Sequence, residues 1–320
     1  MKSINITTTH SRLDLCSATI WSLMHQSVLP DTINLWVSQE SYMADQGIRN
    51  IPNWYYELNN INDILRIHFV KNIGPYRKII PALRIASDDD ILTYADDDVI
   101  YGREWYESLL LSFNEHKAKY IVASRVRLKK INVFGRLQSY NMFNVCNRDI
   151  TLDNRYIVTG VGGCMLTKAH IRDDLIFLDD FISVVPRTDD IWLSKIFEIS
   201  GASVYCCASS LKYIQEITHS NNALNQSNNV IPGGGLLRKV LSKIRNKIFG
   251  YLGFSLSNND KAIRNTDAFL RKEITIKMSK NKLIVKNTLF GNQDDFFVGH
   301  IVLYYQDCIT STWRIRLWLI

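Results

Sequence analysis

The cysteines of this chain form no recognisable framework. Six are present among 320 residues, but none lie in a CxxC pair or at the spacing of a metal site. Two of them, Cys206 and Cys207, are adjacent in the sequence. Adjacent cysteines suit buried thiols better than a disulfide framework, which is typical of secreted proteins. We therefore expect reduced thiols and a cytoplasmic location.

Long apolar segments are also missing. No run of about 18 apolar residues occurs, which is the length that a membrane-spanning helix needs. The N-terminal segment MKSINITTTHSRLD lacks the apolar core of a signal peptide. We expect that any contact with the inner face of the cell membrane is peripheral.

The charge of the chain is positive, with a net value of +7 and a pI of about 9.0, so an anionic partner is expected. Nucleic acid ranks last among such partners, because the sequence has no basic patch interleaved with aromatic residues and no nucleic-acid motif. A nucleotide diphosphate or an anionic membrane surface remains. The content of 46% hydrophobic and 22% charged residues is typical of a globular protein.

Strand and helix patterns alternate in the first third of the chain. Strands are predicted at residues 4–9, 33–38, 65–70 and 91–95, with helical patterns near 15–24 and 77–85 and a loop at 54–56. This alternation favours an α/β fold with a mostly parallel sheet flanked by helices. Ligands of such sheets bind beyond the carboxyl ends of the strands.

Composition suggests three segments. A stretch rich in Asn, Ser and Gly at 219–235 marks a boundary after a catalytic α/β domain at 1–220. A basic amphipathic helical segment follows at 221–270. A β-rich tail of uncertain completeness is predicted at 271–320, so the appendage is helical and β-like.

Three consecutive carboxylates follow the apolar strand ILTY. Asp96 and Asp98 would share one face of that strand, about 6–7 Å apart, because side chains alternate along a strand. At an effective dielectric near 20, two such charges repel by roughly 3 kcal/mol. One alternative is a solvated acidic turn, like Asp88–Asp90. The position at the ligand-binding edge favours a site for Mg²⁺ or Mn²⁺ against a diphosphate.

The order of these motifs resembles a known family. ADDD is similar to the DxD motif of GT-A glycosyltransferases, and residues 3–220 resemble family 2 bacterial sugar transferases of the surface-polysaccharide type. The opening TTTHSRLDLCSATIWSLMHQSVLPDTINLWVS and the segment GPYRKIIPAL carry this resemblance. It implies a GT-A, Rossmann-like fold. The acid that one branch places before Gly-Pro is Asn72 here.

The resemblance implies roles for individual residues in binding a nucleotide-sugar donor. The base and ribose would meet Thr8, Thr9, Arg12 and Glu40, although most relatives carry an acid pair where this chain has Gln39-Glu40. Lys78 would approach the nucleotide, with an ordinary helix-surface lysine as the alternative. Asp98 would coordinate the metal, Asp96 would support it, and Asp97 would belong to the same donor-binding segment.

A second acidic pair opens the predicted helix 189–200 in the sequence TDDIWL. Thr188 and Asp189 alone could cap this helix, and carboxylates are stabilised at helix N-termini by about 0.3–1 kcal/mol. A second carboxylate exceeds what capping requires. The resemblance makes Asp190 the general base that takes a proton from the acceptor hydroxyl, with Asp189 beside it to raise its pKa.

The glycine-rich turn GVGG at 160–163 lacks the third glycine of a dinucleotide-binding GxGxxG motif. In relatives, a turn here lets the backbone approach the donor sugar, which assigns Gly162 and Gly163 to donor binding. His219 lies where some GT-A enzymes place a late metal or phosphate ligand. The alternative for His219 is an ordinary surface histidine.

Residues 236–254 contain five Lys or Arg and no acid around an apolar stripe. The stripe consists of Leu237, Val240, Leu241, Ile244 and Ile248. The segment is either a helix packed on the catalytic domain or a helix lying on anionic lipid, which would suit a lipid-linked glycan acceptor.

Together these features predict a metal-dependent inverting glycosyltransferase of O-antigen or capsule synthesis. Two alternatives stay open. A nucleotidyltransferase would need a glycine-rich basic loop after the first strand, and TTTHSR has no glycine. A non-catalytic carbohydrate- or membrane-binding protein would bind the donor without turnover.

Overall fold

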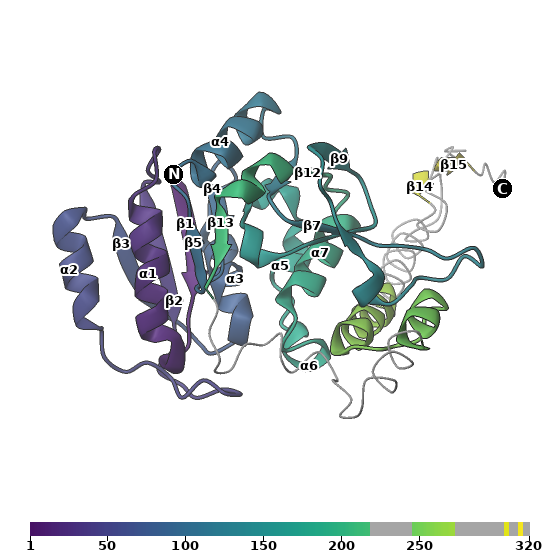
Figure 1. Cartoon of the computed structure of the whole chain (residues 1–320), viewed down its shortest axis with the longest axis horizontal. Helices are drawn as coiled ribbons and strands as arrows, with labels where there is room; N and C mark the ends of the chain where they lie inside the picture. Colours follow the sequence, from purple (N-terminus) through teal and green to yellow (C-terminus); the bar gives the residue numbers. More distant parts are fainter. Residues whose placement is uncertain (218–244, 273–303, 307–312, 316–320) are drawn as a thin grey trace, which may run out of the picture. The chain divides into compact units, whose positions relative to one another are not determined.

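The computed structural model describes residues 1–217, 245–272, 304–306 and 313–315 (Figure 1). The chain divides into two compact units, Met1–Leu270 and Arg271–Ile320. In the second unit, β14 (Tyr304–Gln306) pairs in antiparallel fashion with β15 (Trp313–Ile315). Among the described residues, no helix is long and apolar enough to cross a membrane.

An eight-stranded sheet lies at the centre of the first unit, in the order β3-β2-β1-β4-β11-β6-β12-β9 (Figure 1). Its strands are β1 (Lys2–Thr7), β2 (Thr32–Val37), β3 (Leu65–Phe69), β4 (Ile91–Tyr94), β6 (Ile121–Ala123), β9 (Ile150–Leu152), β11 (Cys164–Leu166) and β12 (Val204–Cys206). Strands β3, β2, β1 and β4 pair in parallel, as do β6 and β12, while β11 and β9 run antiparallel to their neighbours. The predicted mostly parallel α/β sheet flanked by helices is confirmed.

Two apolar cores cover the two faces of this sheet. Strand β6 shows the division, because Ile121 and Ala123 enter one core and Val122 enters the other, as expected for side chains that alternate along a strand. The helices are α1 (Leu13–Met24), α2 (Asn53–Ile61), α3 (Ile80–Ile85), α4 (Trp105–Glu115), α5 (Asp173–Ile176), α6 (Phe181–Val184) and α7 (Asp189–Ile199). Helices α1 and α4 pack in one core, and α3 and α7 pack in the other.

Smaller strands and 3-10 turns surround the sheet. β10 (Tyr156–Val158), β7 (Val126–Leu128) and β8 (Asn144–Val145) form one small sheet, and β13 (Ile214–Glu216) pairs with β5 (Val99–Tyr101). The 3-10 turns are η1 (His10–Arg12), η2 (Gly74–Lys78), η3 (Tyr140–Met142), η4 (Gly160–Gly162), η5 (Lys168–His170) and η6 (Ala208–Tyr213). Cys16, Cys146, Cys164, Cys206 and Cys207 are buried free thiols.

Two local predictions are wrong. Residues 54–56 belong to helix α2 rather than to a loop, although only Leu58 of this helix is buried. The helix expected over 77–85 is divided into η2 and α3. Pro81 causes this division, because it has no amide hydrogen to donate to the carbonyl of Arg77.

Residues 245–251 and 258–272 are helical, and those up to Leu270 belong to the first unit. Asp260 accepts a hydrogen bond from the Ser139 hydroxyl at 2.7 Å, and Asp267 lies 2.9 Å from the Lys195 ammonium. These contacts attach the second helical segment to the α/β unit. Residues 236–244 of the basic stretch lie outside the described residues.

The order of strands in the sheet reverses direction between β1 and β4. The order β3-β2-β1 proceeds in one direction, and the chain then crosses back to place β4 on the other side of β1. At such a switch point the loops after two adjacent parallel strands separate, which leaves room for a ligand at their carboxyl ends. The loops after β1 and β4 carry Thr8–Arg12 and Asp96–Asp98.

Candidate functional site

Asp97 is the buried anchor of this site. The Thr8 hydroxyl donates to Oδ2 of Asp97 at 2.6 Å, and the Arg12 guanidinium pairs with its Oδ1. The Thr19 hydroxyl donates to the Asp97 carbonyl at 2.9 Å. Burial raises the pKa of Asp97 to about 6, while Arg12 and Thr8 oppose the shift. Asp97 therefore ties the loop after β4 to the loop after β1 and to α1.

Asp96 and Asp98 are more open than Asp97, with side chains 30% and 28% exposed against 8%. Strand β4 ends at Tyr94, so both lie in the turn beyond it. The expectation that they alternate along a strand is therefore wrong. They also meet different cations, since Asp96 lies 2.7 Å from Lys78 Nζ and Asp98 lies 2.8 Å from Arg12 Nη2.

Lys78 lies at the centre of the acidic residues. Its ammonium is 2.7 Å from Asp96, 2.8 Å from Asp189 and 3.9 Å from Asp190, and the side chain is 5% exposed. Burial disfavours the ammonium charge, but the three carboxylates outweigh it and hold the pKa of Lys78 well above its usual value. The alternative of an ordinary surface lysine is thus wrong.

Asp189 and Asp190 begin α7, as the sequence predicts. The Thr188 side chain makes no capping hydrogen bond, and Asp189 faces Lys78 instead, so capping does not account for the pair. Oδ1 of Asp190 accepts a hydrogen bond from the Gly160 amide at 3.0 Å. Asp190 is 30% exposed against 10% for Asp189. Burial and then the charge of Asp189 raise the pKa of Asp190.

The turn η4 borders this acidic cluster through its first glycine. A Cβ atom on Gly160 would collide with the Lys78 ammonium and the Asp96 carboxylate. Gly162 and Gly163, the glycines that the sequence assigned to donor binding, pack against other groups. A Cβ on Gly162 would strike the Arg125 backbone, and one on Gly163, whose φ is +78°, would strike the Trp105 ring.

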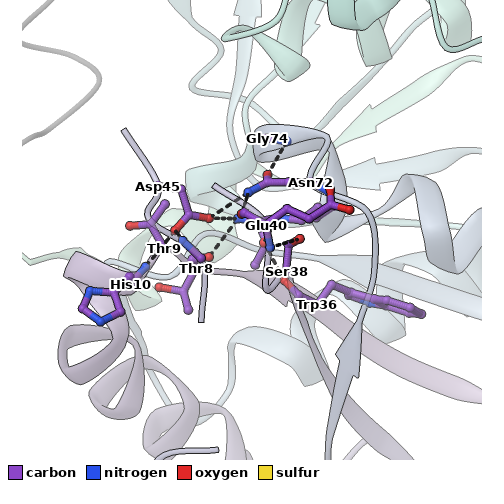
Figure 2. Close-up of polar contacts among 12 residues, drawn as sticks. Thr8, Thr9, His10, Trp36, Ser38, Glu40, Asp45, Asn72 and Gly74 are labelled. Atoms are coloured by element: carbon purple, nitrogen blue, oxygen red, sulfur yellow. Dashed lines mark hydrogen bonds and ion pairs between the residues drawn. The ribbon is translucent and has the colours of Figure 1, made fainter. Parts of the chain in front are cut away.

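A second polar network lies beside the ends of β1 and β2 (Figure 2). Asp45 accepts from the His10 amide at 3.0 Å, the Arg77 guanidinium at 2.9 Å and the Asn72 amide group at 3.3 Å. The Asn72 amide group also donates to the Glu40 carbonyl at 2.8 Å. Figure 2 shows Asp45 beside Thr9 and His10, and Asn72 beside Glu40 and Gly74.

Arg77 holds this network to the first loop. Its guanidinium is buried and donates to the Thr8 carbonyl at 3.0 Å and to the Thr7 hydroxyl at 3.1 Å. No sequence motif predicted a role for Arg77 or Asp45. Arg77 stands beside Lys78 in the segment GPYRK, which was a usable signal, whereas Asp45 lies in a loop with no pattern of its own.

Thr9, Glu40 and His219 are the remaining residues that the sequence predicts for the site. Thr9 contacts Ser11 through the two hydroxyls at 3.3 Å. Glu40 is exposed, and its carboxylate accepts from the Asn72 backbone amide at 3.2 Å. His219 lies outside the described residues. Within the described part of the chain, no three His, Cys, Asp or Glu side chains gather as a metal site.

No protein-family model matches the chain, and no curated protein sequence matches it. Solved structures show distant likeness. The crystal structure of S. aureus TarS 1-349 is 18% identical over 63% of this chain and 57% of its own, with a TM-score of 0.40. The structure of the same TarS fragment in complex with UDP is 16% identical over 63% of this chain and 57% of its own, with a TM-score of 0.39.

Structures of a second kind of protein are similar to this chain to the same degree as TarS. The 2-C-methyl-D-erythritol 4-phosphate cytidylyltransferase of Francisella tularensis is 14% identical over 69% of this chain and 95% of its own, with a TM-score of 0.38. The chain thus spans little more than half of the TarS fragment and nearly all of the cytidylyltransferase. All these TM-scores are below 0.5.

Proposed function

We propose that this chain is an inverting glycosyltransferase that moves a sugar from a nucleotide diphosphate donor to a hydroxyl group of a glycan acceptor. The observation that carries the proposal is the contact of Lys78 with both acidic motifs, Asp96 on one side and Asp189 with Asp190 on the other. A transfer reaction needs a charged group for the leaving diphosphate and a base for the acceptor within one site.

The donor half of the site consists of Arg12, Asp96 and Asp98. Mg²⁺ is usually held by one or two carboxylates, with phosphate oxygens and water completing its ligands. Asp96 and Asp98 are partly exposed, beside Lys78 and Arg12 respectively, and would together hold Mg²⁺ or Mn²⁺, which would supply positive charge to the leaving diphosphate. Asp97 does not fit, because both of its oxygens already accept from Thr8 and Arg12.

The nucleoside half is the network beside β1 and β2. Arg77, Asp45 and Asn72 fix the loops that present Thr9, His10 and Glu40 at the sheet edge. Exposed side chains on loops held in this way can contact a base or ribose without large rearrangement. We assign the nucleoside to this side of the site.

Asp190 is the proposed general base. Its raised pKa and its exposure suit a carboxylate that collects a proton near neutral pH. The acceptor oxygen forms a bond to the anomeric carbon while the bond from that carbon to the diphosphate oxygen breaks. The acceptor proton goes to Asp190, and the electron pair leaves with the diphosphate. The Gly160 amide fixes the direction of the Asp190 carboxylate.

The finer assignment follows the sequence resemblance. We propose a role in bacterial O-antigen or capsule synthesis, with a lipid-linked glycan acceptor and a cytoplasmic protein that meets the inner face of the membrane. The +7 net charge is consistent with an anionic surface as partner.

A donor screen tests the proposal. Nucleotide diphosphate sugars with different bases and sugars are tested by thermal shift with and without Mn²⁺, and release of nucleoside diphosphate is then measured. We expect one donor to raise Tm more with Mn²⁺ and to be turned over. Asp190→Asn should keep the thermal shift and lose the turnover.

Two outcomes contradict the proposal. Release of pyrophosphate from a nucleoside triphosphate and a sugar phosphate would identify a nucleotidyltransferase. Donor binding without any release of diphosphate by the wild-type chain would identify a non-catalytic binding protein.

A further inference from the structure

The loop between β7 and η3 presents an apolar tip. An antiparallel bridge between Ile131 and Leu137 closes the loop. At its tip Val133 is 82% exposed and Phe134 is 69% exposed. These are among the most exposed large apolar side chains of the described residues. Soluble proteins rarely leave neighbouring apolar side chains so open without a partner.

Asn132 holds this tip in a fixed shape. Its side-chain oxygen accepts from the amides of Phe134 at 2.9 Å and Arg136 at 3.0 Å, and Gly135 adopts a φ of +74°. The side chain of Asn132 itself is buried. The exposure of Val133 and Phe134 therefore follows from an ordered turn.

The loop is joined to the helix at residues 245–251. The Asn132 side-chain amide donates to the Tyr251 carbonyl at 2.9 Å, and the Val133 amide meets the Tyr251 hydroxyl at 3.5 Å. Phe249 and Phe254 are exposed on this segment and pack edge to face, with ring centroids 5.1 Å apart. Apolar side chains thus extend from the loop tip to the adjoining helix.

The charged residues of these two chain segments are all basic, although Lys129 at the start of the loop pairs with Glu198 of α7. Residues 116–148 contain eight Lys or Arg and no Asp or Glu, and residues 245–257 contain Arg245 and Lys247 and no acid. Asp260, the nearest acid in the chain after them, is buried and accepts from Ser139 and Tyr140. Lys130 and Arg136 flank the apolar tip in the sequence.

We propose that the loop 129–137 and the segment 245–254 form a docking surface for an anionic phospholipid bilayer. A bilayer presents anionic headgroups above an apolar layer. A protruding apolar tip with cations at its base matches that order, because the tip reaches the acyl boundary while the cations remain at headgroup level. The proposal does not depend on the transferase chemistry, since it concerns a surface that contains none of the acidic residues of the site.

Vesicle co-sedimentation of the full chain tests this surface. We expect binding to phosphatidylcholine vesicles that contain phosphatidylglycerol, weaker binding at high salt, and little binding to phosphatidylcholine alone. The double variant Val133→Ser/Phe134→Ser should bind at least about ten-fold more weakly, because the inserted apolar area is lost. Lys130→Gln/Arg136→Gln should lose the dependence on phosphatidylglycerol.

Ile61→Ser is the matched control. Ile61 is 63% exposed at the end of α2, which lies far from β7 in the α/β unit (Figure 1). It should bind vesicles like the wild type, and all variants should keep the wild-type Tm, since none of the substituted side chains is buried.

Two results overturn the proposal. One is vesicle binding that is unchanged by the tip substitutions. The other is a concentration-dependent dimer, seen by sedimentation velocity and abolished by the tip variant, in a chain that binds no vesicles. That result would assign the tip to a contact between two copies of the chain. Donor turnover by the tip variant should equal that of the wild type, which separates this test from that of the transferase.

Discussion

The ammonium of Lys78 lies 2.8 Å from the Asp189 carboxylate. This contact joins the turn before α3 to the first residue of α7, two segments far apart in the sequence. It places the carboxylates after β4 and those that open α7 around one cation. The proposed division of the site into a donor side and an acceptor side rests on this arrangement.

Replacing the two acids of α7 should separate their roles. Asp190→Asn should reduce turnover at least ~100-fold with little change in donor affinity, because the amide keeps the acceptor for Gly160 but cannot take a proton. Asp189→Asn should reduce turnover less. Steady-state kinetics and donor calorimetry on both variants provide the measurement. The reverse ranking would mean that Asp189 is the base.

The pH dependence of turnover should follow Asp190. Its pKa is raised to about 8, first by burial and then by Asp189, so the base is mostly protonated at neutral pH. Only the ionised form accepts a proton, and kcat/KM should therefore rise with pH and level off above that value. Asp189→Asn removes a neighbouring negative charge and should shift the rising limb to lower pH. A flat profile between about pH 6 and pH 9 contradicts the assignment.

Asp97 and Asp98 should respond differently to the same substitution. Asp97→Asn removes one of the two carboxylates that pair with Arg12 and leaves a buried donor without its acceptor, which should cost about 1–3 kcal/mol of unfolding free energy. Asp98→Asn should leave Tm nearly unchanged, because Asp98 is more exposed, yet it should abolish the Mn²⁺-dependent part of donor binding. Thermal unfolding and calorimetry with and without Mn²⁺ test both statements. Unchanged metal dependence in Asp98→Asn would remove Asp98 from the metal site.

Gly160→Ala should impair the site more than the fold. Its Cβ would displace the Lys78 ammonium and the Asp96 carboxylate, so turnover should fall at least about ten-fold. Gly250→Ala is the control, since its Cβ would meet only the flexible side chains of Leu256 and Met142. Donor turnover and Tm of both variants are compared. Wild-type turnover in Gly160→Ala would mean that the position of Lys78 does not matter.

The sequence by itself predicted the fold class. The four strands β1 to β4 fall within about two residues of their predicted ends, since apolar strand runs bounded by turn residues are local signals. The acids that open α7 were also placed correctly. Helix α2 was missed because it buries only Leu58, and the division at Pro81 was missed because the apolar pattern continues through it.

Only the tertiary structure decided how the charged residues pair. The sequence grouped Asp96 and Asp98 on one face, but the strand ends at Tyr94, and the turn directs Asp96 to Lys78 and Asp98 to Arg12. The sequence also allowed two interpretations of Lys78, a nucleotide contact or an ordinary surface lysine. In the structure Lys78 is buried among three carboxylates. Charge pairing depends on the spatial distance between loops that follow different strands. That distance is set by the order of strands in the sheet, and residue patterns along the chain do not contain it.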